Sequence, residues 1–237
     1  MSRWDALLAV QDHDTTTDQL RHRRRTMPAR GELEAAMAEL GKLERRASEI
    51  EAKRHELAQA QQRLEDEIAK VSEKAELHDK TLYSGTIGNP RELQMLQEDI
   101  ASLKRRVSQL EDQELELMEQ IEPLDVDLLR LADDRAALDD RANALRAQIA
   151  EDEVAIDGQL ATVQAERDDL VAGVEPELLA EYEQVRPHSG GVAIARLVNG
   201  SCGGCHLHLS AMELDRIKKL PPEQPVHCEE CGRLLAR

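Results

Sequence analysis

The stretch TLYSGTIGNP, residues 81–90, separates two long segments in which apolar residues recur every seven positions. Its two glycines, its β-branched residues and its Asn-Pro pair disfavour a continuing helix. Asn89 is suited to capping the next helix, Pro90 fits a first helical position, and Glu92 follows at the third. The stretch therefore predicts a tight turn with a new helix beginning directly after it.

Downstream of the turn, leucine recurs at every seventh position, and a second set of positions between these leucines is also mostly apolar. This is the a/d pattern of a coiled coil, and it is interrupted only at Glu114 and Arg135. It predicts a helix from about 91 to about 172, with a kink near 119–123 because Pro123 removes a backbone hydrogen bond. The first set is Leu96, Leu103, Leu110, Leu117, Leu124, Leu131, Leu138 and Leu145; the second includes Leu93, Ile100, Val107, Ile121, Leu128, Ala142 and Ile149.

The segment before the turn has a seam of its own at Leu43, Ile50, Leu57, Leu64 and Val71. Roughly 80 residues lie on each side of the turn. Two arms of equal length around one turn predict an antiparallel helical hairpin. The apolar seam residues of the two helices would then pack against each other and form the core of the hairpin. A parallel dimer zipper is the alternative, but it leaves the turn unexplained. An earlier helical stretch carries Trp4, and Pro28 either starts a new helix or bends a continuous one.

The composition agrees with long helices rather than with a compact aromatic core. The 237 residues are 33% charged and 1% aromatic, with no phenylalanine. The net charge is −17, yet residues 187–237 hold six basic and five acidic residues. Binding of nucleic acid by the whole surface is therefore opposed, whereas a local basic patch remains open.

The beginning of the chain, MSRWDALLAVQDHD, has acidic residues where a signal peptide needs an apolar run. No stretch approaches 18 uncharged apolar residues, so we expect no membrane span. These features predict a cytoplasmic protein with no membrane partner.

The basic run RHRRR, residues 21–25, admits two interpretations. In a hairpin that turns near residue 86, residue 24 faces roughly residue 148, where acidic residues gather. We therefore predict ion pairs between helices on a solvated face. A surface for a partner or for RNA is the alternative.

All four cysteines lie near the end of the chain, as Cys202-x2-Cys205 and, after 22 further residues, Cys228-x2-Cys231. Thiolates at this spacing suit a tetrahedral zinc ion, and four of them leave no open position for water. In a reducing compartment such pairs indicate a metal rather than disulfides. We therefore predict one structural Zn²⁺ held by these four residues; free or disulfide-bonded cysteines are the alternative.

The sequence around the cysteines predicts a zinc ribbon over 187–237. Expected strands are 192–198 and 233–236, and Gly203, Gly204 and Gly232 are expected to supply unusual backbone angles. The nearby histidines, His206, His208 and His227, are alternative ligands but are more simply surface or packing residues. A short helix begins after Ser210, a possible cap for Glu213. The basic side chains of the ribbon are Arg216, Lys218, Lys219, Arg233 and Arg237.

A helix over 175–186, with Pro176 in its first turn, joins the arm to the ribbon. Because the arm is a hairpin, the ribbon returns to the N-terminal end, where Trp4, this helix and the ribbon can share one small core. The fold class is mainly α: a coiled-coil helical hairpin over 1–174, the connecting helix, and a small C-terminal zinc ribbon.

The combination of a long hairpin, a tip of the form LYSGTIGNPRELQMLQEDI (82–100) and an ending of the form CGGC…CEECGRLL resembles the bacterial C4-type zinc-ribbon coiled-coil family. The resemblance covers essentially the whole chain. It implies a non-enzymatic adaptor, with Cys202, Cys205, Cys228 and Cys231 as metal ligands. Partners proposed for members of that family include an alternative sigma factor, flagellar or secretion components, and messenger RNA. Nothing in this sequence identifies any of those partners as a partner of this chain.

The residues themselves favour an adaptor, scaffold or chaperone-like protein that is not an enzyme, with protein partners and a candidate contact around the tip from Tyr83 to Arg91. A nucleic-acid-binding regulator that uses the ribbon for RNA or DNA is the alternative. Homo-oligomers are a further expectation, because apolar residues off the seam, Leu115, Met118 and Leu129, are free to pair with another arm. No Gly-rich phosphate loop or catalytic triad pattern is present.

Overall fold

The computed structural model describes residues 2–237. Its helices are α1 (Arg3–Arg25), α2 (Pro28–Tyr83), α3 (Pro90–Val171), α4 (Pro176–Val185) and α5 (Ala211–Lys219), with a 3₁₀ turn η1 (Arg186–His188). Its strands are β1 (Ile194–Val198), β2 (Ser201–Cys202) and β3 (Leu234–Ala236). The predicted mainly helical fold class, a long coiled-coil hairpin with a small C-terminal ribbon, is confirmed.

The chain forms two compact units. One contains the residues up to Glu32 together with 145–237, and the other contains 33–144. The predicted domain boundaries at 174 and 186 stay a prediction; α4 lies between them. The compact units divide the chain elsewhere because α1 packs with α4 and the ribbon in a single core.

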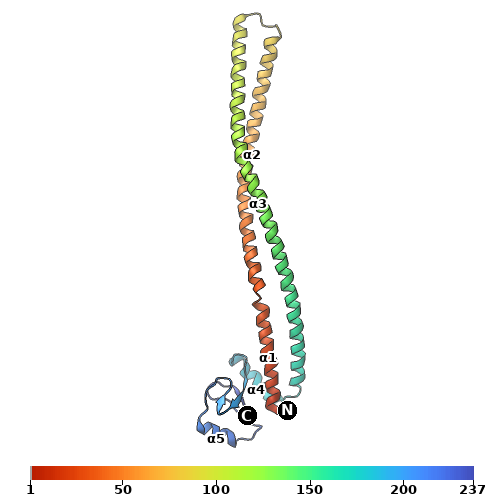
Figure 1. The fold of residues 1–237 in the computed structure, drawn as a ribbon, viewed down its shortest axis with the longest axis vertical. Coiled ribbons are helices and arrows are strands. Elements are labelled where there is room, and N and C mark those ends of the chain that lie inside the picture. Colours follow the sequence, from red (N-terminus) through yellow and green to blue (C-terminus); the bar gives the residue numbers. More distant parts are fainter. Residues whose placement is uncertain (1) are drawn as a thin grey trace. The chain divides into compact units, whose positions relative to one another are not determined.

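In the unit formed by 33–144, α2 and α3 run side by side and antiparallel, joined by the loop between Tyr83 and Pro90 (Figure 1). The cap at the start of α3 is as predicted. The side-chain oxygen of Asn89 accepts a hydrogen bond from the Arg91 backbone N–H at 3.0 Å, and its amide donates to Glu92 at 3.2 Å. This local chemistry fixes where the second arm of the hairpin begins.

The heptad seam is the interior of this hairpin. Leu110 is fully buried, Ile100 and Leu131 are nearly so, and the remaining predicted leucines of α3 between Leu96 and Leu138 are half-buried. On α2, Leu40 and Ala75 are buried and the predicted leucine positions are half-buried. Two helices alone cannot enclose a seam completely, so partial burial is the expected outcome for a two-stranded coiled coil.

Charged residues at the weak points of the seam are paired across the hairpin. Arg135, which interrupts the pattern on α3, contacts Glu44 of α2 at 3.2 Å. Arg54, which interrupts the pattern on α2, pairs with Asp125 of α3. These exposed pairs join facing positions of the two helices, and each contributes at most about 1 kcal/mol.

The two internal prolines behave differently. α1 ends at Arg25 and α2 begins at Pro28, so Pro28 starts a new helix rather than bending a continuous one. Pro123 lies inside α3, which continues through it without interruption. The kink near Pro123 stays a prediction.

One residue of the basic run at the end of α1, Arg24, forms inter-helical ion pairs. Arg24 contacts Glu153 at 3.5 Å and Asp157 at 2.9 Å, and Arg30 shares the same Glu153 carboxylate at 2.5 Å. Arg24 therefore confirms the interpretation of RHRRR as a face that pairs with acidic residues of α3.

Within residues 2–237, none of the helices combines the length and the apolar character that a membrane crossing requires.

Candidate metal centre

One apolar core holds α1, α4 and the ribbon together. It contains Trp4, Leu7 and Val10 of α1, Leu178 and Tyr182 of α4, and apolar residues of β1 and β3. The Trp4 indole N–H donates to the Pro222 carbonyl at 3.2 Å. The predicted shared core of Trp4, the connecting helix and the ribbon is confirmed, so the ribbon is seated on a helical base rather than attached by a linker.

A side chain of α1 completes the hydrogen bonding of the ribbon strand. The amide of Gln11 donates to the Ile194 carbonyl at 2.8 Å and accepts from the Ile194 backbone N–H at 2.7 Å. Gln11 is buried, so both contacts satisfy groups that have no access to water. The glutamine thus fixes the position of β1 on the helix.

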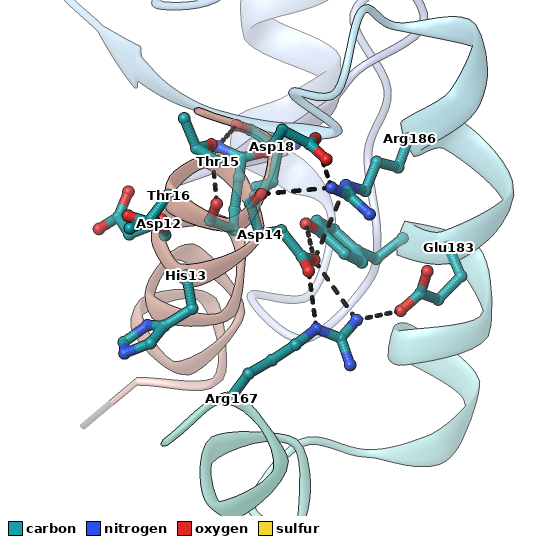
Figure 2. A network of polar contacts seen from close by, with 12 residues as sticks. Asp12, His13, Asp14, Thr15, Thr16, Asp18, Arg167, Glu183 and Arg186 are labelled. Atoms are coloured by element: carbon teal, nitrogen blue, oxygen red, sulfur yellow. Dashed lines mark hydrogen bonds and ion pairs between the residues drawn. The ribbon is translucent and has the colours of Figure 1, made fainter. Parts of the chain in front are cut away.

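A buried carboxylate, Asp14, joins α1 to α3 and α4 (Figure 2). It accepts hydrogen bonds from the Tyr182 hydroxyl at 2.7 Å and from the Arg167 Nε at 2.7 Å, and Arg186 lies 3.8 Å from its second oxygen. Burial together with the hydrogen bond to Asp14 raises the pKa of Tyr182 well above its usual range. The same carboxylate keeps the pKa of Arg167 above its ordinary value, so Arg167 remains a cation.

The ribbon itself is a three-stranded sheet in the order β2-β1-β3. β1 pairs antiparallel with β2 and parallel with β3, with Ala195 opposite Leu235. A second small core lies on this sheet and includes Cys202, Cys228 and Ile217 of α5. Ser210 caps α5 by accepting from the Glu213 backbone N–H at 3.1 Å, as predicted.

The sheet brings the four predicted cysteines together. Their sulfur atoms all lie within 4.8 Å of one another, and the Cys202–Cys231 and Cys205–Cys228 sulfurs are each 3.8 Å apart. A tetrahedral zinc with metal–sulfur distances of about 2.3 Å separates its ligands by about 3.8 Å. A disulfide requires about 2.05 Å, so these residues fit a metal and not a bridge.

Each thiol also receives a backbone N–H from the residue two positions later. Gly204 donates to the Cys202 sulfur at 3.4 Å, and Leu207, Glu230 and Arg233 donate to Cys205, Cys228 and Cys231. Such donors stabilise the negative charge of a thiolate and orient its lone pairs toward the centre. Each of the four sulfurs therefore has a neighbouring donor that suits a thiolate.

Burial and these hydrogen bonds act on the thiols in opposite directions. Burial raises the pKa of Cys228 to about 12. Burial would also raise that of Cys231, but hydrogen bonds from the Arg233 backbone and side chain outweigh it and bring the pKa to about 7. Because the ligands must be thiolates, binding of Zn²⁺ by these residues would release protons and would weaken as pH falls. Four such ligands hold one structural zinc with no coordination position for water.

The neighbouring histidines are engaged elsewhere. His208 contacts the Ser201 hydroxyl at 3.2 Å, and His227 contacts Glu181 at 3.3 Å. Throughout the described chain, the four cysteines are the one group of Cys, His, Asp and Glu side chains close enough together to hold a metal.

The role predicted for the glycines is correct at Gly232, whose φ is 71°, and wrong at Gly203 and Gly204, which do not have positive φ. These two glycines are required by close approach instead. A Cβ on Gly203 would lie 2.9 Å from the Arg196 carbonyl oxygen, and one on Gly204 would lie 2.6 Å from the Arg233 side chain.

The residue after each Cys-x2-Cys pair is left-handed: Gly232 and, unexpectedly, His206, whose φ is 63°. A non-glycine residue in this conformation costs about 1–2 kcal/mol. We expect His206→Gly to raise the apparent zinc affinity about 5- to 25-fold, since 1.4 kcal/mol is tenfold in binding. Gly232→Ala should lower it by a similar factor. Competition with a chromogenic chelator measures both. His208→Gly, at a position without positive φ, is the matched control, and an equal gain there would contradict the explanation.

Of the five basic side chains expected to form a basic face on the ribbon, four make contacts within it. Arg216 donates to Glu213 at 2.7 Å, and this guanidinium lowers the pKa of the glutamate. Lys219 pairs with Asp215 at 2.5 Å. Arg233 donates to two backbone carbonyls, and Arg237 to four. Two of these cations are therefore paired with carboxylates, and Arg233 and Arg237 keep their charge while their hydrogen-bond donors are engaged within the ribbon.

Similar proteins are known from bacteria. The chain is 30% identical over 239 residues to the uncharacterized protein Rv2229c of Mycobacterium tuberculosis, covering 98% of this chain and 94% of that protein. Among solved structures, a protein from Mycobacterium smegmatis aligns with a TM-score of 0.87 at 23% identity, over 100% of this chain and 97% of that one. CT398 from Chlamydia trachomatis aligns with a TM-score of 0.71 at 21% identity, over 98% and 96%.

The two parts of the chain match two described domains. Residues 10–190 match the CT398-like coiled coil hairpin domain, and residues 201–235 match the C4-type zinc ribbon domain. The first match covers most of the chain and includes the turn and both seams, and the second includes all four cysteines. The chain therefore belongs to the family of CT398-like coiled-coil hairpin proteins that end in a C4-type zinc ribbon.

Proposed function

We propose that this protein is a non-enzymatic adaptor that binds other proteins through its helical arm, in a scaffold-like or chaperone-like role, with the zinc ribbon as a structural element. The observation that carries the proposal is the tip of the hairpin. Tyr83 is 81% exposed there, and Leu77 and Met95, on the two helices leading to the tip, are exposed as well. Large apolar side chains gathered on an exposed surface favour a role in binding proteins.

The tip is also ordered by its own hydrogen bonds. The Ser84 hydroxyl donates to the Thr81 carbonyl at 2.7 Å and lies 2.7 Å from the Thr86 hydroxyl. With Asn89 capping α3, these contacts tie the loop to the ends of both helices, which reduces the entropy that a partner would have to remove on binding. The proposal includes a cytoplasmic location, since a reducing compartment keeps the four thiols available for zinc.

The alternative, nucleic-acid binding through the ribbon, stays a prediction. The ion pairs of Arg216 and Lys219 weigh against it. The ribbon also has no Phe, Tyr or Trp side chain on which a base could stack.

Affinity capture from a bacterial cytosolic lysate, with and without nuclease, tests the proposal. Full-length protein should retain a protein partner after nuclease, and Tyr83→Ser should reduce the captured amount at least fivefold. Met212→Ser is the matched control, because Met212 is 85% exposed but lies on α5 of the ribbon; its yield should not change. If nucleic acid is recovered and the captured proteins are lost after nuclease, the adaptor function is wrong and nucleic-acid binding takes its place.

A further inference from the structure

A row of exposed apolar residues follows one face of α3 within the unit formed by 33–144. Leu115, Met118, Val126 and Leu129 are 55%, 48%, 60% and 70% exposed. Their spacings of three, eight and three residues place them on a single helical face, with Glu122 at the centre of the row. We call Leu115, Met118, Glu122, Val126 and Leu129 the α3 stripe.

The hairpin does not use the α3 stripe for its own packing. The seam residues of the same segment, Leu117, Ile121, Leu124 and Leu128, are half-buried, whereas the four apolar residues of the stripe are exposed. Successive residues of a helix are separated by about 100°, so Leu115 and its neighbours along the stripe point away from the seam. An apolar surface that the fold leaves uncovered is a candidate site for a partner.

The segment that carries the stripe is strongly acidic. Residues 111–129 contain eight Asp or Glu residues and no Lys, Arg or His. Only Asp125, which pairs with Arg54, has a cationic partner within the described structure. The remaining seven are Glu111, Asp112, Glu114, Glu116, Glu119, Glu122 and Asp127. The stripe is thus an apolar row bordered by carboxylates whose charge the protein itself does not neutralise.

We propose that the α3 stripe binds a basic amphipathic helix of a partner protein, one that lays Leu-like residues along the stripe and places Lys or Arg against the flanking carboxylates. The inference rests on the adaptor function and specifies the chemistry of one partner. The apolar row supplies the area removed from water, and the acidic border selects a cationic helix and steers its approach. Glu122, in the middle of the row, pairs with a central cation of the bound helix.

The same charges disfavour other occupants. A second copy of this chain would bring seven further unpaired carboxylates against these seven, and like charges without partners oppose that pairing. Nucleic acid is repelled for the same reason. With a cationic helix, by contrast, the carboxylates that border the α3 stripe attract the partner and so favour binding.

A synthetic peptide tests the proposal directly. The probe is a fluorescent 20-residue amphipathic helix of Leu and Lys, compared with a Leu/Glu peptide of the same pattern and a scrambled Leu/Lys peptide. Anisotropy with the full-length protein should show saturable one-to-one binding of the patterned Leu/Lys peptide that weakens as salt rises. The scrambled peptide should bind at least tenfold more weakly, and the Leu/Glu peptide should not bind.

Variants locate the contact. Leu115→Gln with Leu129→Gln should weaken the patterned peptide at least tenfold, whereas Met95→Gln, an equally exposed residue of α3 near the tip, should change it less than twofold. Glu122→Lys should weaken binding several times more than Glu116→Lys, which makes the same change in charge one residue from Leu115 and off the stripe. Equal losses in the members of either pair, or equal binding of the scrambled peptide, would overturn the proposal.

Two further measurements separate this inference from the adaptor function. Self-association in sedimentation that disappears in the Leu115→Gln/Leu129→Gln variant would identify a second copy as the occupant and overturn the proposal. A lysate partner that this variant retains, while Tyr83→Ser loses it, would leave the adaptor function intact and likewise overturn the stripe as its docking site.

Discussion

Replacing Cys202 and Cys228 together by serine should abolish zinc binding and unfold the ribbon while most of the helix content remains. Each change removes one thiolate from a centre whose four sulfurs lie within 4.8 Å of one another. Structural zinc contributes roughly 10–16 kcal/mol to the folding of small zinc domains, more than a module of about 50 residues gains from its own core. The small core that includes Cys202, Cys228 and Ile217 cannot replace it.

The hairpin should survive this change because its seam is independent of the metal. α2 and α3 contain 56 and 82 helical residues, whereas α1, α4 and α5 contain 23, 10 and 9. Since α1 and α4 share a core with the ribbon, we expect helix loss to be confined mainly to these short elements. Circular dichroism at 222 nm should therefore fall by a minor fraction.

Elemental analysis should give one zinc per chain for the unmodified protein and none for the double variant. His208→Ala is the matched control: it lies in the same turn, contacts Ser201 rather than the metal, and should keep one zinc. A double variant that retains zinc would refute the four-cysteine assignment. Loss of most of the 222 nm signal would instead show that arm and ribbon unfold as one cooperative unit.

The second large effect is expected at Asp14, which is 4% exposed. Asp14→Asn should destabilise the unit that contains α1, α4 and the ribbon by about 3–5 kcal/mol, the usual cost of removing one partner from a buried ion pair. Asparagine keeps the shape but loses the charge opposite Arg167 and Arg186 and cannot accept as strongly from the Tyr182 hydroxyl.

Trp4 provides the measurement, because it is the sole tryptophan of the chain and lies in the core of this unit. Urea unfolding followed by its fluorescence should shift to a lower midpoint in Asp14→Asn. Asp12→Asn makes the same chemical change two residues away at an exposed position, and it should stay within about 0.5 kcal/mol of the unmodified protein. Equal midpoints for Asp14→Asn and the unmodified protein would show that the network does not stabilise the unit.

Buried polar residues join α1 to α3, α4 and the ribbon. No pattern in the sequence marks them as the heptad spacing marks the hairpin seam. Asp14 meets Arg167 and Tyr182 across separations of 153 and 168 residues, and Gln11 meets Ile194 across 183. On α1 these residues stand among other polar residues, so only their burial distinguishes them. A buried polar position inside an otherwise apolar helical face is the one pattern that could have pointed to Gln11 and Asp14.

Elements that depend on local or periodic interactions could be predicted from the order of the residues alone. Asn89 and Pro90 place the turn through capping, the heptad leucines define the hairpin seam, and the spacing of Cys202 and Cys205 brings two sulfurs to one metal. Which polar groups find partners depends on how distant segments pack. Packing engages the donors of Arg233 with backbone carbonyls, places His206 in a left-handed conformation, and leaves the carboxylates beside the α3 stripe unpaired. These outcomes depend on which groups lose contact with water when distant segments pack, and neither spacing nor composition specifies that.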